Sequence, residues 1–335
     1  MDLDLSVPLH FPFGPLRKMS MLPVHSPEDM VSDAYSEAWL AGPQSTQFYT
    51  RTYRANGYES KAVVVFIHGF VEHVGRYTQV HPVLAAHGFN VFTFDQRGFG
   101  KTALDEEHKS ALSAYGKTSG EDQLDDIQWA IDHAKKEFPG LPLFLSGHSM
   151  GGGEMLNFSV RRDASGLAGV IASSPIIRPT KHSIFEGAAL AAGGAIATLF
   201  PYTPIPIPMD YNALSHDTIY NNMCKNDVLA KRQGTLRGVV DMLNWGEELL
   251  SVNYKKWPNT LPILFVHGTA DQITSPEATK EFLNKIIADD KQLILYTDGF
   301  HELLQEPADR EKLVHDEIAW MDAHLSKAPE WRIAK

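Results

Sequence analysis

The chain has 335 residues, of which 43% are hydrophobic and 10% aromatic, so it can bury a large core and is not a disordered tail. Its 41 acidic and 30 basic residues give a net charge of −11, which argues against nucleic-acid binding because attraction to phosphate needs a basic surface. The single cysteine, Cys224, excludes an internal disulfide and a cysteine-ligated zinc or iron–sulfur site, and it fits a reducing, intracellular setting.

Residues 1–40 are rich in proline and lack a regular apolar period, so we expect an N-terminal arm without chemistry. They also lack the basic start and apolar middle of a secretory signal, and we expect a cytoplasmic protein that is not secreted. Residues 47–54 then alternate as a strand does, Asn56 and Gly57 indicate a turn, and residues 63–67 form a continuous apolar run. This order predicts a hairpin that leads into a buried strand.

Short apolar runs then alternate with amphipathic patterns along most of the remaining chain. Such an alternation predicts an α/β fold, with a mostly parallel sheet that helices cover on both faces. The predicted strands are residues 91–94, 143–145, 167–172, 263–266 and 293–296, and the predicted helices are residues 77–88, 124–138, 277–287 and 310–325.

The interval 176–258 breaks this alternation, because it is helical in pattern, interrupted by prolines and without a convincing strand. We interpret it as a helical cap inserted between two parts of the core, residues 41–175 and 259–335. Residues 187–209 within it carry no charge, but their helical part ends near Phe200, before the prolines. This helical part is therefore too short to span a membrane, which requires about 20 apolar residues.

Residues 147–151 match the pattern G-x-S-x-G directly after the apolar run 143–145. A serine at a sharp turn from strand to helix projects its hydroxyl above the sheet, and its flanking glycines avoid a collision with neighbouring backbone. Ser149 is therefore the candidate nucleophile. A phosphate-binding loop is disfavoured, because the chain lacks G-x-x-x-x-G-K-[ST] and has no G-x-G-x-x-G at its first strand.

A serine nucleophile needs a histidine to accept its proton and a carboxylate to orient that histidine. Asp271 and His301 each follow a predicted strand, where the sites of open α/β sheets form, and the order Ser149, Asp271, His301 is that of an α/β-hydrolase triad. Asp298 remains the rival acid. The other candidates are expected to be structural: His68, His148 and His267, and Asp95 as a loop-fixing carboxylate near Arg97.

Acyl transfer also requires backbone N–H donors that meet the oxyanion. One donor should be the amide of Met150, which follows the nucleophile, and the other the amide of Phe70, in the loop after residues 63–67. No histidines have a metal-ligand spacing such as H-E-x-x-H, so we expect no metal site.

Four segments carry a wider resemblance: residues 68–77, 94–100 and 147–152, and the pair 267–271 with 299–304. Together they resemble the monoglyceride lipases of the α/β-hydrolase superfamily. The resemblance implies hydrolysis of monoacylglycerol to fatty acid and glycerol without a cofactor. By position it implies a triad, two oxyanion amides, and a pair of charged residues near the polar leaving-group pocket: Ser149, Asp271 and His301; Phe70 and Met150; Glu72 and Arg76.

The same machinery would serve a lysophospholipase, an acyl thioesterase or a general carboxylesterase, and the sequence separates these poorly. Epoxide hydrolases and haloalkane dehalogenases are disfavoured, because they have an aspartate where this chain has Ser149. A peptidase that acts on N-terminal residues is a further alternative. In a different class, the chain could be a catalytically inactive hydrolase fold that serves as a binding scaffold.

The apolar stretch 188–200 is expected to form a cap helix that roofs the acyl chain and contacts the surface from which the lipid is drawn. That surface would be a lipid droplet or the endoplasmic reticulum membrane, with the protein bound peripherally. The alternative is a buried cap helix without a membrane role. Asp227, farther along the cap, is expected to be solvated or to cap a helix.

Overall fold

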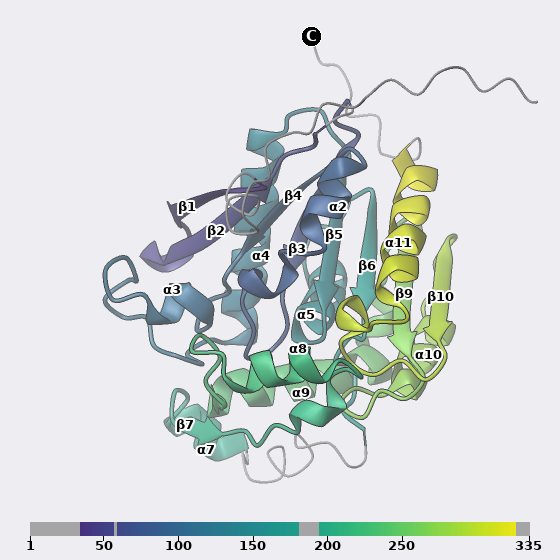
Figure 1. Cartoon of the computed structure of the whole chain (residues 1–335). Helices are drawn as coiled ribbons and strands as arrows, with labels where there is room; N and C mark the ends of the chain where they lie inside the picture. The colour runs from purple at the N-terminus through teal and green to yellow at the C-terminus, as the bar shows by residue number, and fades with distance from the viewer. Residues whose placement is uncertain (1–33, 57–58, 181–193, 326–335) are drawn as a thin grey trace, which may run out of the picture. The chain divides into compact units, whose positions relative to one another are not determined.

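The computed structural model describes residues 34–56, 59–180 and 194–325, all within one compact unit. Its centre is an eight-stranded sheet in the order β1-β2-β4-β3-β5-β6-β9-β10 (Figure 1). Strand β2 is antiparallel to β1 and β4, and all other neighbours are parallel. The strands are β1 (Ser36–Ala41), β2 (Gln47–Tyr53), β3 (Ala62–Ile67), β4 (Phe89–Phe94), β5 (Leu143–His148), β6 (Gly169–Ser173), β9 (Ile263–Gly268) and β10 (Lys291–Tyr296).

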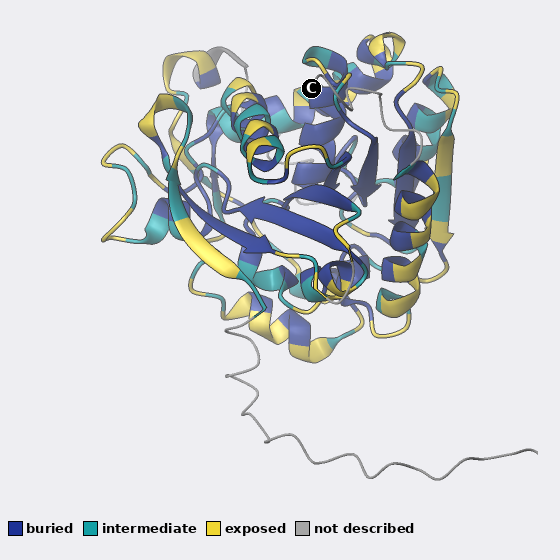
Figure 2. Cartoon of the chain, turned by 90° about the horizontal axis from the view of Figure 1, so that it is seen from above, coloured by how far each residue is buried: buried dark blue, intermediate teal, exposed yellow. Residues whose placement is uncertain are grey.

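Helices cover both faces of this sheet, because successive side chains of each strand point to opposite sides. In β3, Val63 and Val65 pack with helices α4, α5 and α10, whereas Val64 and Phe66 pack with α2 and α11. The central strands are accordingly buried throughout (Figure 2). The helices of the core are α2 (His81–Ala86), α3 (Gly100–Leu104), α4 (Gly120–Glu137), α5 (Met150–Arg161), α10 (Pro276–Lys285) and α11 (Arg310–His324).

Helix α4 illustrates how local sequence sets an element. The side chain of Ser119 accepts a hydrogen bond from the Asp122 amide and so caps the first turn. The apolar residues of α4 face the sheet, and the helix ends at Glu137, just before Pro139 and Gly140. The α/β fold with a mostly parallel sheet, predicted from this kind of pattern, is confirmed, as are the predicted core strands and helices within a few residues.

Two predictions about the N-terminal part of the core are wrong. Strand β2 does not form a hairpin with β3; it pairs with β1 and β4. Strand β3 is apolar on both faces and therefore lies at the centre between β4 and β5. Residues 36–40, predicted as part of an arm, lie in β1, an edge strand whose largely exposed side chains lack an apolar period. Residues 1–33 and Gly57 lie outside the described residues.

A helical segment between β6 and β9 lies across the ends of the strands (Figure 1). Two short antiparallel strands pair within it, which corrects the prediction that this interval holds no strand; at three residues each, they are too short to show a period. Among the residues that the structure describes, none of the helices has the length and apolar character to cross a bilayer. The elements of the cap are α7 (Gly194–Leu199), β7 (Pro204–Pro206), α8 (Thr218–Lys225), β8 (Gln233–Thr235) and α9 (Leu236–Ser251).

Five short 3₁₀ helices complete the described elements and lie in the connections between longer ones. Two of them matter for the site, because one precedes α2 in the loop after β3 and another follows the last strand. They are η1 (Pro43–Ser45), η2 (Val74–Tyr77), η3 (Tyr211–Ala213), η4 (Asn253–Lys256) and η5 (Leu303–Gln305).

Helix α5 carries a buried carboxyl group, that of Glu154, inside the core. Burial, together with the negative field of Asp126, raises the pKa of Glu154 well above its ordinary value of 4.5. Its pKa is thus higher in the folded protein than in the unfolded chain. The stability that this difference contributes is fully present below the unfolded pKa and is lost as the pH rises through the folded pKa.

Replacing Glu154 by glutamine should remove this loss, because the amide has the shape of the carboxylic acid and cannot ionise. We expect Glu154→Gln and wild type to be equally stable at pH 4, and the variant to be more stable at pH 8 by on the order of 1–3 kcal/mol, because each unit of pKa difference between the folded and unfolded states is worth about 1.4 kcal/mol. Urea unfolding at both pH values measures this. Glu107→Gln, at an exposed position, is the control. A variant less stable than wild type at pH 8 would contradict the prediction.

Candidate active site

Ser149 occupies a sharp turn between strand β5 and helix α5. Its backbone has a φ of 53°, in a region that few non-glycine residues adopt. A Cβ on Gly147 would lie 2.7 Å from the carbonyl carbon of Gly151, and a Cβ on Gly151 would lie 2.3 Å from the carbonyl oxygen of Ile67. Both positions therefore require glycine. The strand-to-helix turn predicted from the motif is confirmed.

The structure brings Ser149, His301 and Asp271 together. His301 Nε2 lies 2.9 Å from Ser149 Oγ, and His301 Nδ1 lies 2.8 Å from Asp271 Oδ2. Asp271 follows β9 and His301 follows β10, so the parallel pairing of these strands places both side chains at one edge of the sheet. All three residues are buried.

The Asp271 carboxylate is held by more donors than His301 alone. The amides of Ile273 and Thr274 donate to Oδ1, and the Thr274 hydroxyl donates to Oδ2 at 2.8 Å. Burial by itself opposes ionisation, but the charge of His301 and hydrogen bonds from His267 and His301 lower the pKa of Asp271 well below its ordinary value. Asp271 is therefore an anion that fixes the tautomer and the orientation of the His301 ring.

The other acids take different positions. Asp298, the rival acid, is exposed, and its own amide donates to Thr269 Oγ1. Asp95 fixes loops as expected, because its oxygens accept hydrogen bonds from the amides of Val74 and Lys101. Arg97, however, pairs with Asp126 at 2.6 Å.

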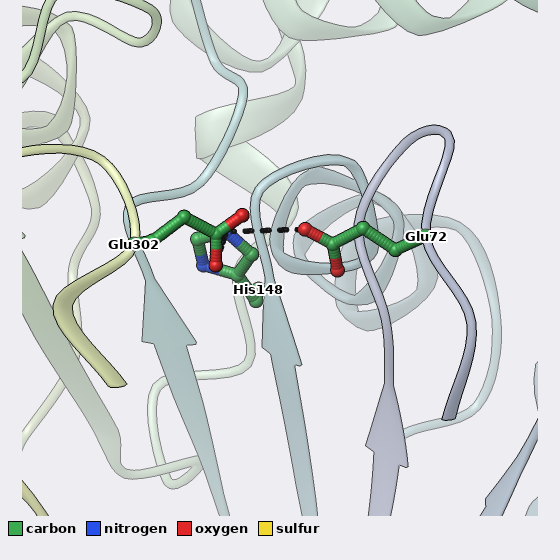
Figure 3. A group of neighbouring side chains, drawn as sticks. All are labelled: Glu72, His148 and Glu302. Atoms are coloured by element: carbon green, nitrogen blue, oxygen red, sulfur yellow. Dashed lines mark ion pairs between the residues drawn. The ribbon is translucent and has the colours of Figure 1, made fainter. Parts of the chain in front are cut away.

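The remaining histidine side chains near the strand ends contact other residues of the core. The His68 ring accepts a hydrogen bond from the Gln96 amide, and the His267 ring contacts Thr279 Oγ1 at 3.0 Å and Asp271 Oδ2 at 3.2 Å. The His148 side chain lies beside Glu302 and Glu72 (Figure 3). These placements leave His301 as the histidine hydrogen-bonded to Ser149.

The two backbone amides predicted as oxyanion donors lie on segments that flank Ser149. Met150 is the first residue of α5, and the N–H groups of a helix's first turn have no intrahelical acceptor. Phe70 follows β3, in a loop that the hydrogen bond from the Gly69 amide to Glu72 Oε2 holds at 2.8 Å. Phe70 and Ser149 line the same cavity.

A cavity of about 300 Å³ opens onto Ser149 and His301. Its walls come from the core loops and from the cap segment before α8, and they include both apolar and charged residues. Within the described part of the predicted roofing helix, Ala197 packs against Leu236 of α9; residues 188–193 lie outside the described residues. The cavity is lined by Phe70, Glu72, Arg76, Ser149, Thr180, Met209, Asp210, Ala213, Leu214, Asp271, Gln272, Ile273, His301 and Glu302.

Glu72 and Arg76 meet in this cavity, as the resemblance implied. Arg76 Nη1 lies 3.9 Å from Glu72 Oε1, and Glu72 Oε2 also accepts a hydrogen bond from the Tyr77 hydroxyl. On its other side, Arg76 Nη2 lies 3.2 Å from Oδ2 of Asp227 in the cap. The expectation that Asp227 is solvated or caps a helix is therefore wrong: it binds Arg76, and it also binds the His73 ring at 3.0 Å.

Three site residues were missed by the sequence analysis: Thr274, Asp227 and Glu302. Thr274 lies three residues after Asp271, and Glu302 directly follows His301, so proximity in sequence to the triad is the signal that could have found them. Asp227 has no such signal, because it belongs to the cap and reaches Arg76 across more than a hundred intervening residues.

Comparison with protein families gives a match over residues 58–308 to the family described as Hydrolase_4, serine aminopeptidase, S33. The chain belongs to this family. The S33 match contains all of the triad candidates and the two loops that carry the proposed oxyanion amides. The resemblance to monoglyceride lipases noted from the sequence is confirmed by the relatives described next.

This S33 family member is 31% identical, over 80% of its length, to an uncharacterized abhydrolase domain-containing protein of Dictyostelium discoideum, of which it spans only 27%. It is also 31% identical to a putative monoglyceride lipase of Schizosaccharomyces pombe, covering 78% of this chain and 68% of that protein. A soluble variant of monoglyceride lipase from Saccharomyces cerevisiae, solved in complex with a substrate analog, superimposes with a TM-score of 0.77 at 26% identity, covering 87% of this chain and 94% of that one.

Substitution of Gly151 tests the close packing of the turn. In Gly151→Ala the new methyl group meets the main chain of Ile67, which cannot move aside without shifting β3. We expect a loss of about 1–3 kcal/mol in the free energy of unfolding, as for other overpacked cores, measured by urea denaturation. Gly166→Ala is the matched control, because its methyl group meets only the flexible end of Lys135. Equal losses of unfolding free energy in both variants would contradict the prediction that contact with the Ile67 main chain destabilises Gly151→Ala.

Proposed function

We propose that this protein is a serine hydrolase that cleaves monoacylglycerols to fatty acid and glycerol. The observation that carries the proposal is the hydrogen-bonded series Ser149, His301, Asp271, which opens into a cavity lined by both apolar and charged side chains. Such a cavity matches a lipid ester with an apolar acyl chain and a polar alcohol. The monoglyceride lipases among its relatives support the same substrate.

In the proposed reaction, His301 Nε2 takes the proton of Ser149 as Oγ attacks the ester carbonyl. The oxyanion that forms accepts hydrogen bonds from the amides of Phe70 and Met150, which are in place before the charge develops. The tetrahedral intermediate collapses, the glycerol oxygen takes the proton from His301, and the acyl group remains on Ser149. Water then attacks the acyl-enzyme, His301 again acts as base, and the fatty acid leaves.

The two kinds of lining residue suit the two halves of this substrate. Met209, Leu214 and Ile273 offer apolar surface to the acyl chain. Glu72 and Arg76 lie where the leaving alcohol would be, and their carboxyl and guanidinium groups can hydrogen-bond the glycerol hydroxyls. Lysophospholipids, acyl thioesters and small esters would use the same nucleophile, so they are the competing substrates in any test.

Ser149→Ala should abolish turnover while the fold persists, because the acyl group then has no nucleophile to receive it. We expect wild type to release glycerol from monoacylglycerols faster than it cleaves lysophospholipids, acyl thioesters or aminoacyl anilides, and the variant to lose at least about 10³-fold in kcat. Ser159→Ala removes a buried hydroxyl from the same helix and should retain activity. A loss in kcat far below about 10³-fold in purified Ser149→Ala, or a preference for another substrate in wild type, would contradict the proposal.

We further propose that the cap contacts a lipid surface and that the protein is cytoplasmic and peripheral on lipid droplets or endoplasmic reticulum membrane. Leu199 and Phe200, at the end of α7, have exposed fractions of 74% and 65%, and Tyr202 beside them is 44% exposed. Apolar side chains of this size favour burial in the boundary between headgroups and acyl chains. The apolar composition of residues 187–193, which precede them, supports the same surface.

A vesicle-binding measurement tests this contact. The double variant Leu199→Ser, Phe200→Ser should bind phosphatidylcholine vesicles at least about 10-fold more weakly than wild type, because burying each such side chain is worth about 1.5–3 kcal/mol. Co-sedimentation with vesicles measures the bound fraction. Leu112→Ser is the control, because Leu112 is 80% exposed but lies in a loop of the core. Equal vesicle binding by wild type and the double variant would overturn the proposal.

A further inference from the structure

A cluster of three buried ionisable side chains lies beside the triad, and two of them, His148 and Glu302, have no role in the reaction described above. His148 Nε2 lies 3.4 Å from Glu302 Oε2 and 3.8 Å from Glu72 Oε1 (Figure 3). The three side chains are at most 4% exposed. Ionisable groups are rarely buried this deeply unless they are paired, so this cluster needs a physical explanation.

The positions of His148 and Glu302 in the chain suggest that explanation. His148 directly precedes Ser149, and Glu302 directly follows His301. The contact between His148 and Glu302 therefore runs beside the hydrogen bond between Ser149 and His301, and it joins the same two loops. The rings of His148 and His301 are 4.8 Å apart. Two adjacent residues of one segment, His148 and Ser149, thus each contact one of two adjacent residues of the other, Glu302 and His301.

A proton suits this cluster better than a metal ion. The candidate ligand atoms of Glu72, His148 and Glu302 lie within 4.8 Å of one another, a spacing that could also hold a cation. The Arg76 guanidinium, however, already lies 3.9 Å from Glu72 Oε1 and would repel one. Burial lowers the pKa of His148, but the charge and hydrogen bonding of Glu302, with the charge of Glu72, outweigh it and raise that pKa to about 9. Burial and the charge of Glu302, to which Glu72 is hydrogen-bonded, raise the pKa of Glu72 to about 7. An imidazolium beside the Glu302 carboxylate accounts for the geometry.

We propose that Glu302, acting through His148, is a positioning residue that holds the His301 loop in register with Ser149. The role rests on the proposed serine hydrolase function but not on which ester is cleaved. Hydrogen-bond distances in an active site must be held to within a fraction of an ångström. The bonds from the His301 ring to Ser149 and Asp271 fix the ring, and the buried ion pair adds a separate link between the residue before Ser149 and the residue after His301.

Charged and titratable groups face this ion pair from several elements, and each bears on its response to pH. Glu302 and Glu72 raise the pKa of His148, and Asp271 adds to this effect. Glu72 is itself approached by Arg76 and by the Tyr77 hydroxyl. Glu72 and Glu302 also interact with each other, and His301 lies beside the cluster. Asp227, Tyr220 and Cys224 of the cap interact with Arg76.

The test compares Glu302→Gln, His148→Gln and the double variant. Each single variant should lower kcat at least about 10-fold with little change in KM, because the nucleophile is less well aligned while the substrate pocket remains. The kcat of the double variant should be no lower than that of the more impaired single variant, since both substitutions break the same contact. Labelling by a fluorophosphonate gives the fraction of competent sites and the acylation rate. Glu317→Gln, a buried glutamate on α11, is the control and should keep full kcat.

A pH series on wild type gives a second readout that does not depend on any variant folding. The labelling rate should fall above about pH 9, where His148 loses its proton, and this alkaline decline should be absent in Glu302→Gln. The proposal is overturned by unchanged kcat in Glu302→Gln, by additive losses in the double variant, by a rate that stays level to pH 10, or by a metal ion bound stoichiometrically to the cluster. If wild type is labelled normally but cleaves no ester, the proposed function fails and the labelling rates still test the positioning role.

Discussion

The site depends on how closely the backbone of helix α5 approaches strand β3. The α-carbon of Gly151 sits against the carbonyl oxygen of Ile67, so that no side chain fits between them. This contact forces the chain through a tight turn and holds Ser149 at a positive φ. It also brings the first amide of α5 and the loop after β3 to the same side of the serine, where both can meet one oxyanion. The chemistry thus follows from a packing constraint on the main chain.

Much of the core could be predicted from the sequence, because strands buried on both faces have a local signature. The run from Val63 to Ile67 is apolar without interruption, and such a run is typical of the centre of a parallel sheet. The pairing of β2 could not be predicted in the same way. Strand partners are set by contacts between distant segments, and the nearby Asn56 and Gly57 favoured a local hairpin that the chain does not form. Edge strand β1 lacked an apolar period because its side chains are mostly exposed.

The triad candidates were found because their positions follow a topological rule. Asp271 and His301 come after strands whose ends meet at one edge, and a motif identified Ser149. The residues that support them follow no such rule. Thr274 donates to Asp271 within a turn, whereas His148 meets Glu302 and Arg97 meets Asp126 only after the sheet has assembled. Composition and spacing record which groups a protein contains, but a buried ion pair is decided by the three-dimensional path of two loops.

Arg76 is shared between the core and the cap, since Glu72 lies on one side of its guanidinium and Asp227 on the other. The cap and the loop after β3 are thereby linked through one guanidinium that lines the cavity. Any displacement of the cap that carried Asp227 away would remove one acidic neighbour of Arg76 and alter the electrostatic potential at that part of the cavity wall. The charge that the core presents to a bound molecule therefore depends on the position of the cap.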